Sequence, residues 1–223
     1  MNGGVAIFVK TPGFSPVKTR LAATLGHAEA ARWHRLAAAA VASVTAGLPG
    51  LTAYWAVAEA DSEAYDAWSG LPCLAQGAGP LGARMGRVHA ELLARHDFAL
   101  LLGADTPQLD AAHLCTAMAW LATETPRMAM GRARDGGFWL LGSNRQPPAA
   151  AWTKHPCGQD DTAAGYREAM AACGTWHELP PLTDVDELAD LSAMLTEMAH
   201  LEQPTPAQLQ LSDRTRAALA RLG

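Results

Sequence analysis

Short apolar runs alternate with helical patterns along almost the whole of this 223-residue chain, and this alternation restricts the possible folds more than any other feature. Apolar runs predict strands at residues 4–9, 52–58, 73–76, 98–102 and 176–179. Two further strands are predicted to meet near Asp135 and Gly136, in the segment MAMGRARDGGFWLLG. Such an order is typical of an α/β sheet with helices on both faces. We expect one domain over residues 1–200 and a helical appendage over residues 201–223.

The helices between these strands are predicted from apolar spacing and from capping residues. An apolar stripe from Trp33 to Val44 recurs at helical spacing and predicts a long alanine-rich helix that ends near Gly47. Other helices are predicted after the glycine-rich loop at 77–82, from the cap Asp110 to about Leu121, from Asp160 and Asp161 onward, after Asp186, and as a short C-terminal piece capped by Ser212.

Composition limits the class of partner. The chain is 49% hydrophobic and 17% charged, which excludes disorder for most of it, and its formal net charge of -5 argues against a general nucleic-acid coat. We expect small-molecule partners, no membrane insertion and a cytoplasmic location, because no charged-then-apolar leader opens the sequence. The four cysteines form no CxxC pair, so we expect neither a zinc site nor a disulfide framework.

The stretch FVKTPGFSPVKTRLA follows the first predicted strand and places three cationic side chains on one loop. It is not a Walker P-loop, since Val17 stands where a glycine must precede Lys18, and the prolines of this loop remove backbone N–H donors. An anion here would therefore depend on the side chains of Lys10, Lys18 and Arg20, of which the arginine can hold phosphate oxygens in a bidentate manner. A solvated basic turn is the alternative interpretation.

A second glycine-rich stretch, GAGPLG at residues 77–82, has the formal spacing of a dinucleotide-binding fingerprint. The preceding strand is very short, the loop is not the first strand–helix turn, and Pro80 lies where backbone donors should face a pyrophosphate. We therefore prefer a loop that recognises a base or ribose through its backbone, with a plain loop as the alternative.

Acidic residues stand at the ends of predicted strands, where ligands gather in open α/β sheets. Asp105 ends a strand in LLLGADTP, and Asp184 and Asp186 are two residues apart, which puts both carboxylates on one face of an extended segment. Together they could supply oxygen ligands to Mg²⁺ or Mn²⁺. The alternatives are a turn at Asp105, a helix cap at Asp186 and a solvated helix face at Asp190.

The segment RDGGF allows two interpretations as well. Asp-Gly is the favoured pair of a tight hairpin turn, so the segment can be purely structural. Alternatively, Gly136 and Gly137 let a ligand approach the backbone closely, while Asp135 binds its hydroxyl groups.

Taken in order, FVKTPGFSPVKTRLA, QGAGPLGARM, GADTPQL, RDGGFWLLG and DVDELADL resemble the DUF2064 proteins, glycosyltransferase-like relatives of the CofC nucleotidyltransferases. The likeness runs from about Gly4 to Leu191. It implies a three-layer α/β/α sandwich with a mostly parallel mixed sheet, of the GT-A nucleotide-diphospho-sugar transferase type. Two departures are Ser15-Pro16 in place of the usual Pro-Gly-Arg and the lack of Thr-Pro after Asp-Val-Asp.

The resemblance also implies roles for individual residues. Lys18, Arg20 and Asp105 would take part in catalysis, and a Mg²⁺ or Mn²⁺ ion would be held by Asp105, Asp184 and Asp186. Substrate would be bound by Lys10, Thr19, Gln76, Gly77, Gly79, Leu81, Gly82, Asp135, Gly136 and Gly137.

Three functions follow as hypotheses. The first is a metal-dependent glycosyltransferase that uses a nucleotide-sugar and a small-molecule acceptor. The second is a nucleotidyltransferase that joins a nucleoside triphosphate to a phosphorylated small acid, as CofC-like enzymes do. The third is a catalytically silent nucleotide-binding module. The base, sugar, acceptor, catalytic base and oligomeric state are left open by the sequence.

Overall fold

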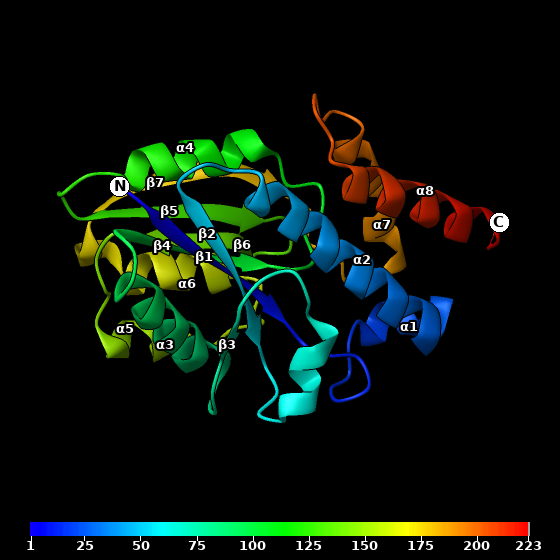
Figure 1. The fold of residues 1–223 in the computed structure, drawn as a ribbon, viewed down its shortest axis with the longest axis horizontal. Helices are drawn as coiled ribbons and strands as arrows, with labels where there is room; N and C mark the ends of the chain where they lie inside the picture. Colours follow the sequence, from blue (N-terminus) through cyan, green and yellow to red (C-terminus); the bar gives the residue numbers. More distant parts are fainter. Residues whose placement is uncertain (223) are drawn as a thin grey trace.

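The computed structural model describes residues 1–222 and is built on one seven-stranded sheet (Figure 1). The strands lie in the order β3-β2-β1-β4-β6-β5-β7, and β6 runs antiparallel to both of its neighbours, β4 and β5. This confirms a mostly parallel mixed sheet. The strand bounds are β1 Gly3–Val9, β2 Leu51–Val57, β3 Cys73–Ala75, β4 Phe98–Gly103, β5 Arg127–Ala133, β6 Phe138–Ser143 and β7 Thr175–Leu182.

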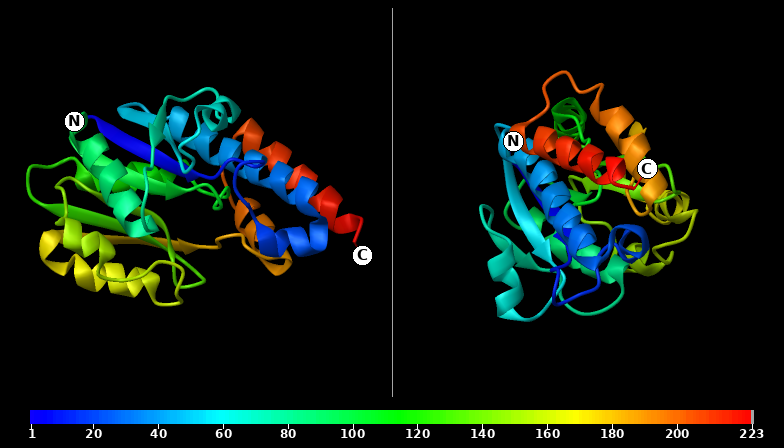
Figure 2. Two further views of the ribbon diagram at one scale, coloured as in Figure 1. Left: turned by 90° about the horizontal axis from the view of Figure 1, so that it is seen from below. Right: turned by 90° about the vertical axis from the view of Figure 1, so that its right-hand side faces the viewer.

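Helices cover both faces of the sheet, which confirms the three-layer architecture (Figure 2). The helix bounds are α1 Thr19–Leu25, α2 His27–Ala46, α3 Leu81–Leu93, α4 Ala111–Leu121, α5 Ala149–Thr153, α6 Thr162–Ala169, α7 Leu188–Met198 and α8 Pro206–Ala220, with short 3-10 turns at Ser62–Ala67 and Ala171–Cys173. Side chains of α2 and α4 share one core cluster with the sheet, and those of α3, α5 and α6 share the other. Asp110 caps α4 as predicted, through a bond from Ala112 N to its carboxylate.

The central pair of strands sets the position of the functional loops. β1 lies between β2 and β4, and Val5 and Ile7 are fully buried because the sheet is covered on both faces. The parallel register pairs Phe8 with Gly103, so β1 and β4 end side by side. The loop that carries Lys10 to Lys18 therefore begins next to the loop that carries Asp105.

One expectation and one alternative interpretation are wrong near these loops. The segment after Lys18 is not only a loop, because α1 begins at Thr19. Asp186 does not cap α7: the cap is Glu187, in a capping box with Asp190. The Asp190 carboxylate accepts the backbone N–H of Asp186 and of Glu187, at 2.9 and 2.7 Å, so Asp190 is not a free solvated side chain.

The C-terminal helix is longer than predicted. It begins after Thr205, whose hydroxyl accepts the N–H of Gln208, and Ser212, the predicted cap, is buried in the interior of α8. Figures 1 and 2 show α8 running beside α2, and Leu211 is buried in a third core cluster formed with α2 and α7. The Gln208 amide donates to the carbonyls of Pro107 and Leu109, both at 2.9 Å. The division of the chain at residue 200 stays a prediction.

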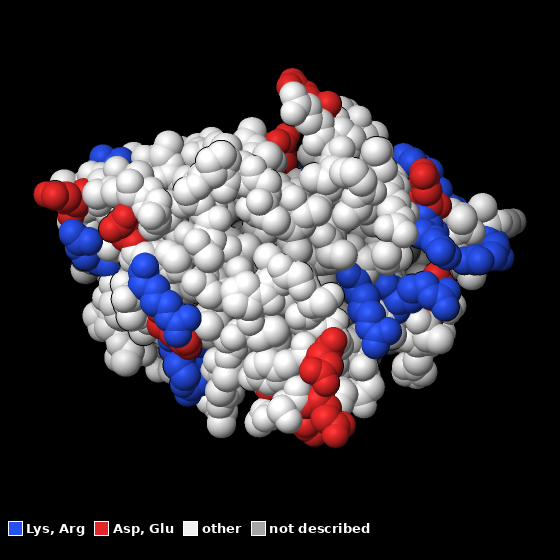
Figure 3. Space-filling model, in the orientation of Figure 1, with Lys and Arg blue, Asp and Glu red and all other residues white. Residues whose placement is uncertain are grey.

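Charged side chains are sparse on the face of the molecule seen in Figure 3, where they gather toward the edges of the view. Within residues 1–222, no helix has both the length and the apolar character needed to cross a bilayer.

Candidate functional site

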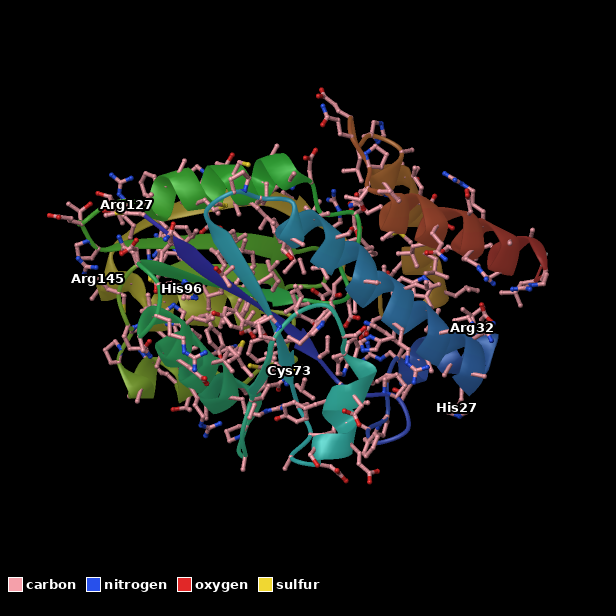
Figure 4. The ribbon with its side chains drawn as sticks, in the orientation of Figure 1. His27, Arg32, Cys73, His96, Arg127 and Arg145 are labelled. Carbon is pink, nitrogen blue, oxygen red and sulfur yellow. The ribbon has the colours of Figure 1, made fainter. Side chains whose placement is uncertain are left out.

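The candidate site lies where the loops after β1, β4 and β7 meet, at the carboxyl ends of the parallel strands. Val185 N donates to Asp105 O at 3.1 Å and joins the second and third of these loops. Figure 4 places His96, Arg127 and Arg145 at the other end of the sheet, near the N-terminus. The site occupies the position at which ligands bind in open α/β sheets.

The Lys18 ammonium group is the centre of the site. Its Nζ lies 2.8 Å from Asp105 Oδ2 and 3.2 Å from Asp186 Oδ1, and it also donates to Val185 O. The side chain is only 4% exposed, against 29% for Asp105 and 50% for Asp186. Lys18 adopts a left-handed backbone conformation with φ 44°, which costs energy in a residue that has a Cβ. The fold thus directs a buried cation between residues that the sequence predicted as metal ligands.

The charges of this cluster shift one another's ionisation. Burial opposes the charge on Lys18, but the carboxylates of Asp105, Asp184 and Asp186 outweigh it and raise the pKa of the ammonium. Burial would raise the pKa of Asp105, yet Lys18 and His34 lower it well below its usual range. Burial and the charge of Asp105 raise the pKa of Asp184 to about 7, against the opposing effect of Lys18. The Lys18–Asp105 pair is therefore held in its ionised form.

The predicted metal ligands are close together but are not arranged around an ion. Within residues 1–222, no group of three or more histidine, cysteine or acidic side chains has the geometry to hold a metal. The chemistry of the donors still suits a hard cation, because Asp184 Oδ1 is buried without a hydrogen-bond partner and Asp105 and Asp186 supply further oxygens. The ammonium of Lys18 must give up part of its contacts before a cation can use all three carboxylates.

A cavity of about 490 Å³, here called the basic chamber, opens on one side of this cluster. It is lined by the cations Lys10, Lys18, Arg20 and Arg84, by the acids Asp105 and Asp186, and by neutral side chains that include Thr19, His34, Gln76 and Leu81. Cations outnumber acids, so the chamber suits an anionic ligand. All the residues of the first loop that were predicted to hold phosphate lie in its wall.

The segment 76–82 has both lining and packing roles. Gln76 lines the basic chamber, but its amide donates to the carbonyls of Val9 and Ala56, and its Oε1 accepts from Arg84 at 2.7 Å. Gly82 packs against Trp152, whose carbonyl oxygen would be 1.9 Å from a Cβ at this position. The third glycine of the GxGxxG spacing is thus needed for contact between helices. Base recognition by residues 76–82 stays a prediction.

A second cavity, of about 390 Å³ and here called the acidic chamber, opens beside the first. It shares Phe8, Arg20, Leu81, Gly103 and Asp186 with the basic chamber. Its acids are Asp135, Asp160, Asp184 and Asp186, and its other lining residues include Gly137, Phe138, Trp139 and Cys157. The two chambers therefore meet at Asp186, with Asp105 in the wall of one and Asp184 in the wall of the other.

The hairpin turn at RDGGF forms one wall of the acidic chamber. Gly136 has φ 92°, and a Cβ there would be 1.7 Å from the backbone oxygen of Asp160, so only glycine allows the two loops to touch. The Asp135 carboxylate accepts the N–H of Gly137 at 2.9 Å. The turn is thus both a structural hairpin and a lining element, and its predicted role in substrate binding is untested.

Sequence reasoning missed three side chains of the site. His34, on α2, contacts Asp105 Oδ1 at 3.2 Å and Lys10 O at 3.1 Å, and it lay unnoticed within an apolar helical stripe. Arg84 enters the basic chamber from α3, and its place in the segment GARMGR next to the glycine-rich loop was the available signal. Asp160 was interpreted only as the start of a helix.

Comparison with protein families places this architecture in a known group. The profile described as "Uncharacterized protein conserved in bacteria (DUF2064)" matches residues 38–159, which is more than half of the chain. The chain belongs to the DUF2064 family. This confirms the resemblance seen in the sequence motifs, although the match itself excludes the first loop and the segment after β7. No protein of curated function matches the chain.

Solved structures confirm the nucleotide-diphospho-sugar transferase fold of this DUF2064 protein. A provisionally named nucleotide-diphospho-sugar transferase from Desulfovibrio desulfuricans aligns with a TM-score of 0.85 at 24% identity, over 100% of this chain and 99% of that one. CMP:2-keto-3-deoxy-manno-octonic acid synthetase in complex with CTP aligns with a TM-score of 0.55 at 12% identity, over 89% and 99%. A Mycobacterium tuberculosis protein in complex with manganese aligns with a TM-score of 0.50 at 16% identity, over 87% and 99%. These neighbours show the fold of the chain and leave its substrates undefined.

Proposed function

We propose that this DUF2064 protein is a metal-dependent glycosyltransferase that takes a nucleotide-sugar as donor and a small molecule as acceptor. The observation that carries the proposal is the junction of the two chambers at Asp186, with Lys18 and Asp105 in the wall of the basic chamber and Asp184 in the wall of the acidic chamber. A donor diphosphate in the basic chamber would place its sugar at this junction, and an acceptor would approach from the acidic chamber. The name of the Desulfovibrio neighbour supports this assignment through the shared fold.

The residues of the chain act mainly through electrostatics in this mechanism. Lys10, Lys18 and Arg20 bind the diphosphate and stabilise the negative charge that develops on the leaving nucleoside diphosphate. The ammonium of Lys18 is buried beside three acceptors, and the contacts that a bound cation would take over leave it free to face the diphosphate. His34 contacts the Asp105 carboxylate, and the Val185 N–H donates to the Asp105 carbonyl, so both keep the Asp105 segment in position.

Asp105, Asp184 and Asp186 are the residues that would hold a divalent cation. Such a cation would supply Lewis-acid stabilisation to the diphosphate. The manganese bound by the mycobacterial neighbour supports a divalent cation in this fold. Asp184 offers the most available ligand oxygen for a cation, because its Oδ1 is buried and has no hydrogen-bond partner in the protein.

Nucleotidyl transfer is the second candidate. It is favoured by the fold neighbour that contains CTP, whose name describes a synthetase of a CMP-sugar. In this reaction a phosphorylated acid attacks the α-phosphate of a nucleoside triphosphate and pyrophosphate leaves. The same basic loop and carboxylates would serve both reactions, so the products must distinguish them.

The test is to incubate the protein with a panel of nucleotide-sugars and nucleoside triphosphates, with Mn²⁺ or with EDTA. We expect release of nucleoside diphosphate from one nucleotide-sugar, only with the metal, and we expect Asp105→Asn to weaken nucleotide binding in calorimetric titration. Pyrophosphate as the sole product would reject glycosyl transfer in favour of the second candidate. Binding without any product across the panel would favour the silent module, and equal binding in EDTA and to Asp105→Asn would reject the metal.

A further inference from the structure

Acidic side chains outnumber cationic ones in the lining of the acidic chamber. Four carboxylates from three separate segments line it: Asp135 from the β5–β6 turn, Asp160 from the loop before α6, and Asp184 and Asp186 from the loop after β7. Arg20 is the one cation among the described lining residues. Its NH1 lies 3.3 Å from Asp186 Oδ2 and 3.8 Å from Glu187 Oε1, and in the proposed function this side chain binds the diphosphate in the basic chamber.

The chamber also offers hydrogen-bond acceptors that have no donor. Asp184 Oδ1 is buried and unpartnered, and Asp135 uses only Oδ1 for a bond to the N–H of Gly137. Hydroxyl and ammonium groups can donate to such oxygens, whereas an ionised phosphate or carboxylate has no proton to give. When no cation is bound, the unsatisfied oxygen of Asp184 can accept a hydrogen bond from a ligand in the chamber.

Apolar side chains form much of the remaining wall. Phe138 packs edge-on against Tyr166 with ring centroids 5.3 Å apart, and Leu81, Met85 and Trp139 add further apolar surface. A carbon ring or chain with several hydroxyl groups matches this combination, because its C–H surface can lie on the apolar wall while its O–H groups reach the carboxylates.

We propose that the acidic chamber is the acceptor site and that it takes a hydroxyl compound without any anionic group, with amine-bearing polyols and sugars preferred. The assignment of the ligand as an acceptor rests on the proposed function. The preference for an uncharged or cationic ligand depends only on the side chains that line the chamber. It separates the two candidate reactions, since a phosphorylated acid would have to enter beside Asp135 and Asp160, which the proposed cation does not use.

Cys157 provides a probe inside the chamber. Its thiol lines the acidic chamber and lies 3.2 Å from the hydroxyl of Tyr166, whereas Cys115 is exposed on α4 and serves as an internal reference. Burial raises the pKa of the Cys157 thiol and so lowers its reactivity. Because this applies to every reagent, it cancels when the labelling rates of two reagents at Cys157 are divided. Labelling of both cysteines is followed by mass spectrometry of their peptides in the intact protein.

The experiment compares a trimethylammonium-ethyl methanethiosulfonate with its sulfonate-ethyl analogue. We expect the cationic-to-anionic rate ratio at Cys157 to exceed that at Cys115 by about tenfold, in keeping with a field that concentrates one sign of charge. Asp160→Asn should reduce this excess severalfold. Asp161→Asn is the matched control, because Asp161 is the neighbouring acid, is 71% exposed and contacts His155 at 3.0 Å. Equal ratios at the two cysteines, or no labelling of Cys157 by either reagent, would overturn the proposal.

The ligand class is tested by protection. Glucosamine and glucose should slow the labelling of Cys157 and leave Cys115 unchanged, and glucose 6-phosphate should protect least. Protection by glucose 6-phosphate equal to or greater than that by glucosamine would overturn the inference, as would no protection by either unphosphorylated probe. These measurements contain no nucleotide, so they stand or fall separately from the release of nucleoside diphosphate that tests the proposed function.

Discussion

Replacing Lys18 with methionine tests whether its ammonium is the resident cation of the acidic cluster. Methionine keeps an unbranched side chain and removes the charge that contacts Asp105 at 2.8 Å and Asp186 at 3.2 Å. Removal of one partner from a buried ion pair costs about 3–5 kcal/mol. Asp186 is half exposed, and water will take over part of its solvation, so the lower end applies. We expect a loss of about 3 kcal/mol in the free energy of unfolding, or roughly 6–12 °C in Tm for a chain of this size.

The assay is thermal and urea unfolding of the wild type and of Lys18→Met, in EDTA and in Mg²⁺ or Mn²⁺. Lys10→Met is the control, because Lys10 lies on the same loop with an exposed side chain. If the metal and the ammonium share the carboxylates, the metal should stabilise Lys18→Met more than the wild type; a ligand present at a hundred times its Kd contributes about 2.7 kcal/mol. A variant as stable as the wild type in EDTA, or equal stabilisation of both by metal, would refute the reasoning.

Two further predictions concern the core. Burial lowers the pKa of His89 to about 4, whereas the value in the unfolded chain is 6.5, so the unfolded state binds the proton first as the pH falls. The stabilisation by neutral His89 is complete above pH 6.5, and the free energy of unfolding falls by about 3 kcal/mol as the pH drops to 4. A His89→Asn variant that loses as much stability over this pH range would contradict the prediction. Gly82→Ala would place a Cβ 1.9 Å from Trp152 O and should lower the free energy of unfolding in urea by at least about 1–3 kcal/mol. Gly47→Ala is the control and should be close to neutral, because no atom lies nearer than 3.8 Å to its Cβ. Similar losses for both variants would reject the packing argument.

The fold could be predicted because each strand and most helices have local signals. The apolar run at 98–102 and the cap at Asp110 are examples, and the structure confirms both. The alternative of a cap at Asp186 could not be decided locally, because two acids are adjacent and only the reciprocal bond between Glu187 and Asp190 decides which one is the cap. Likewise, Thr205 followed by Pro206 and Gln208 is a sequence pattern typical of a helix start, and it indicates the observed cap better than Ser212 does.

The arrangement of the site could not be predicted in the same way. Lys18 was expected to face phosphate and Asp105 to face metal, and nothing in their local sequence shows that the two side chains contact each other across 87 residues of chain. His34 and Asp160 belong to segments whose local patterns are fully explained by helices. Their place in the chambers depends on how distant loops meet at the end of the sheet, which is a property of the topology.

The two bonds from Gln208 to the loop after β4 have a consequence for the order in which the protein matures during synthesis. Every strand of the sheet, and Asp105 itself, is translated before residues 205–220, which are added at about 5–20 residues per second. Until α8 forms, the carbonyls of Pro107 and Leu109 lack these partners, and the apolar side of α2 around Trp33 lacks its cover. A nascent chain that already contains the whole sheet therefore still lacks the partners of the loop that follows Asp105, and the docking of α8 supplies them.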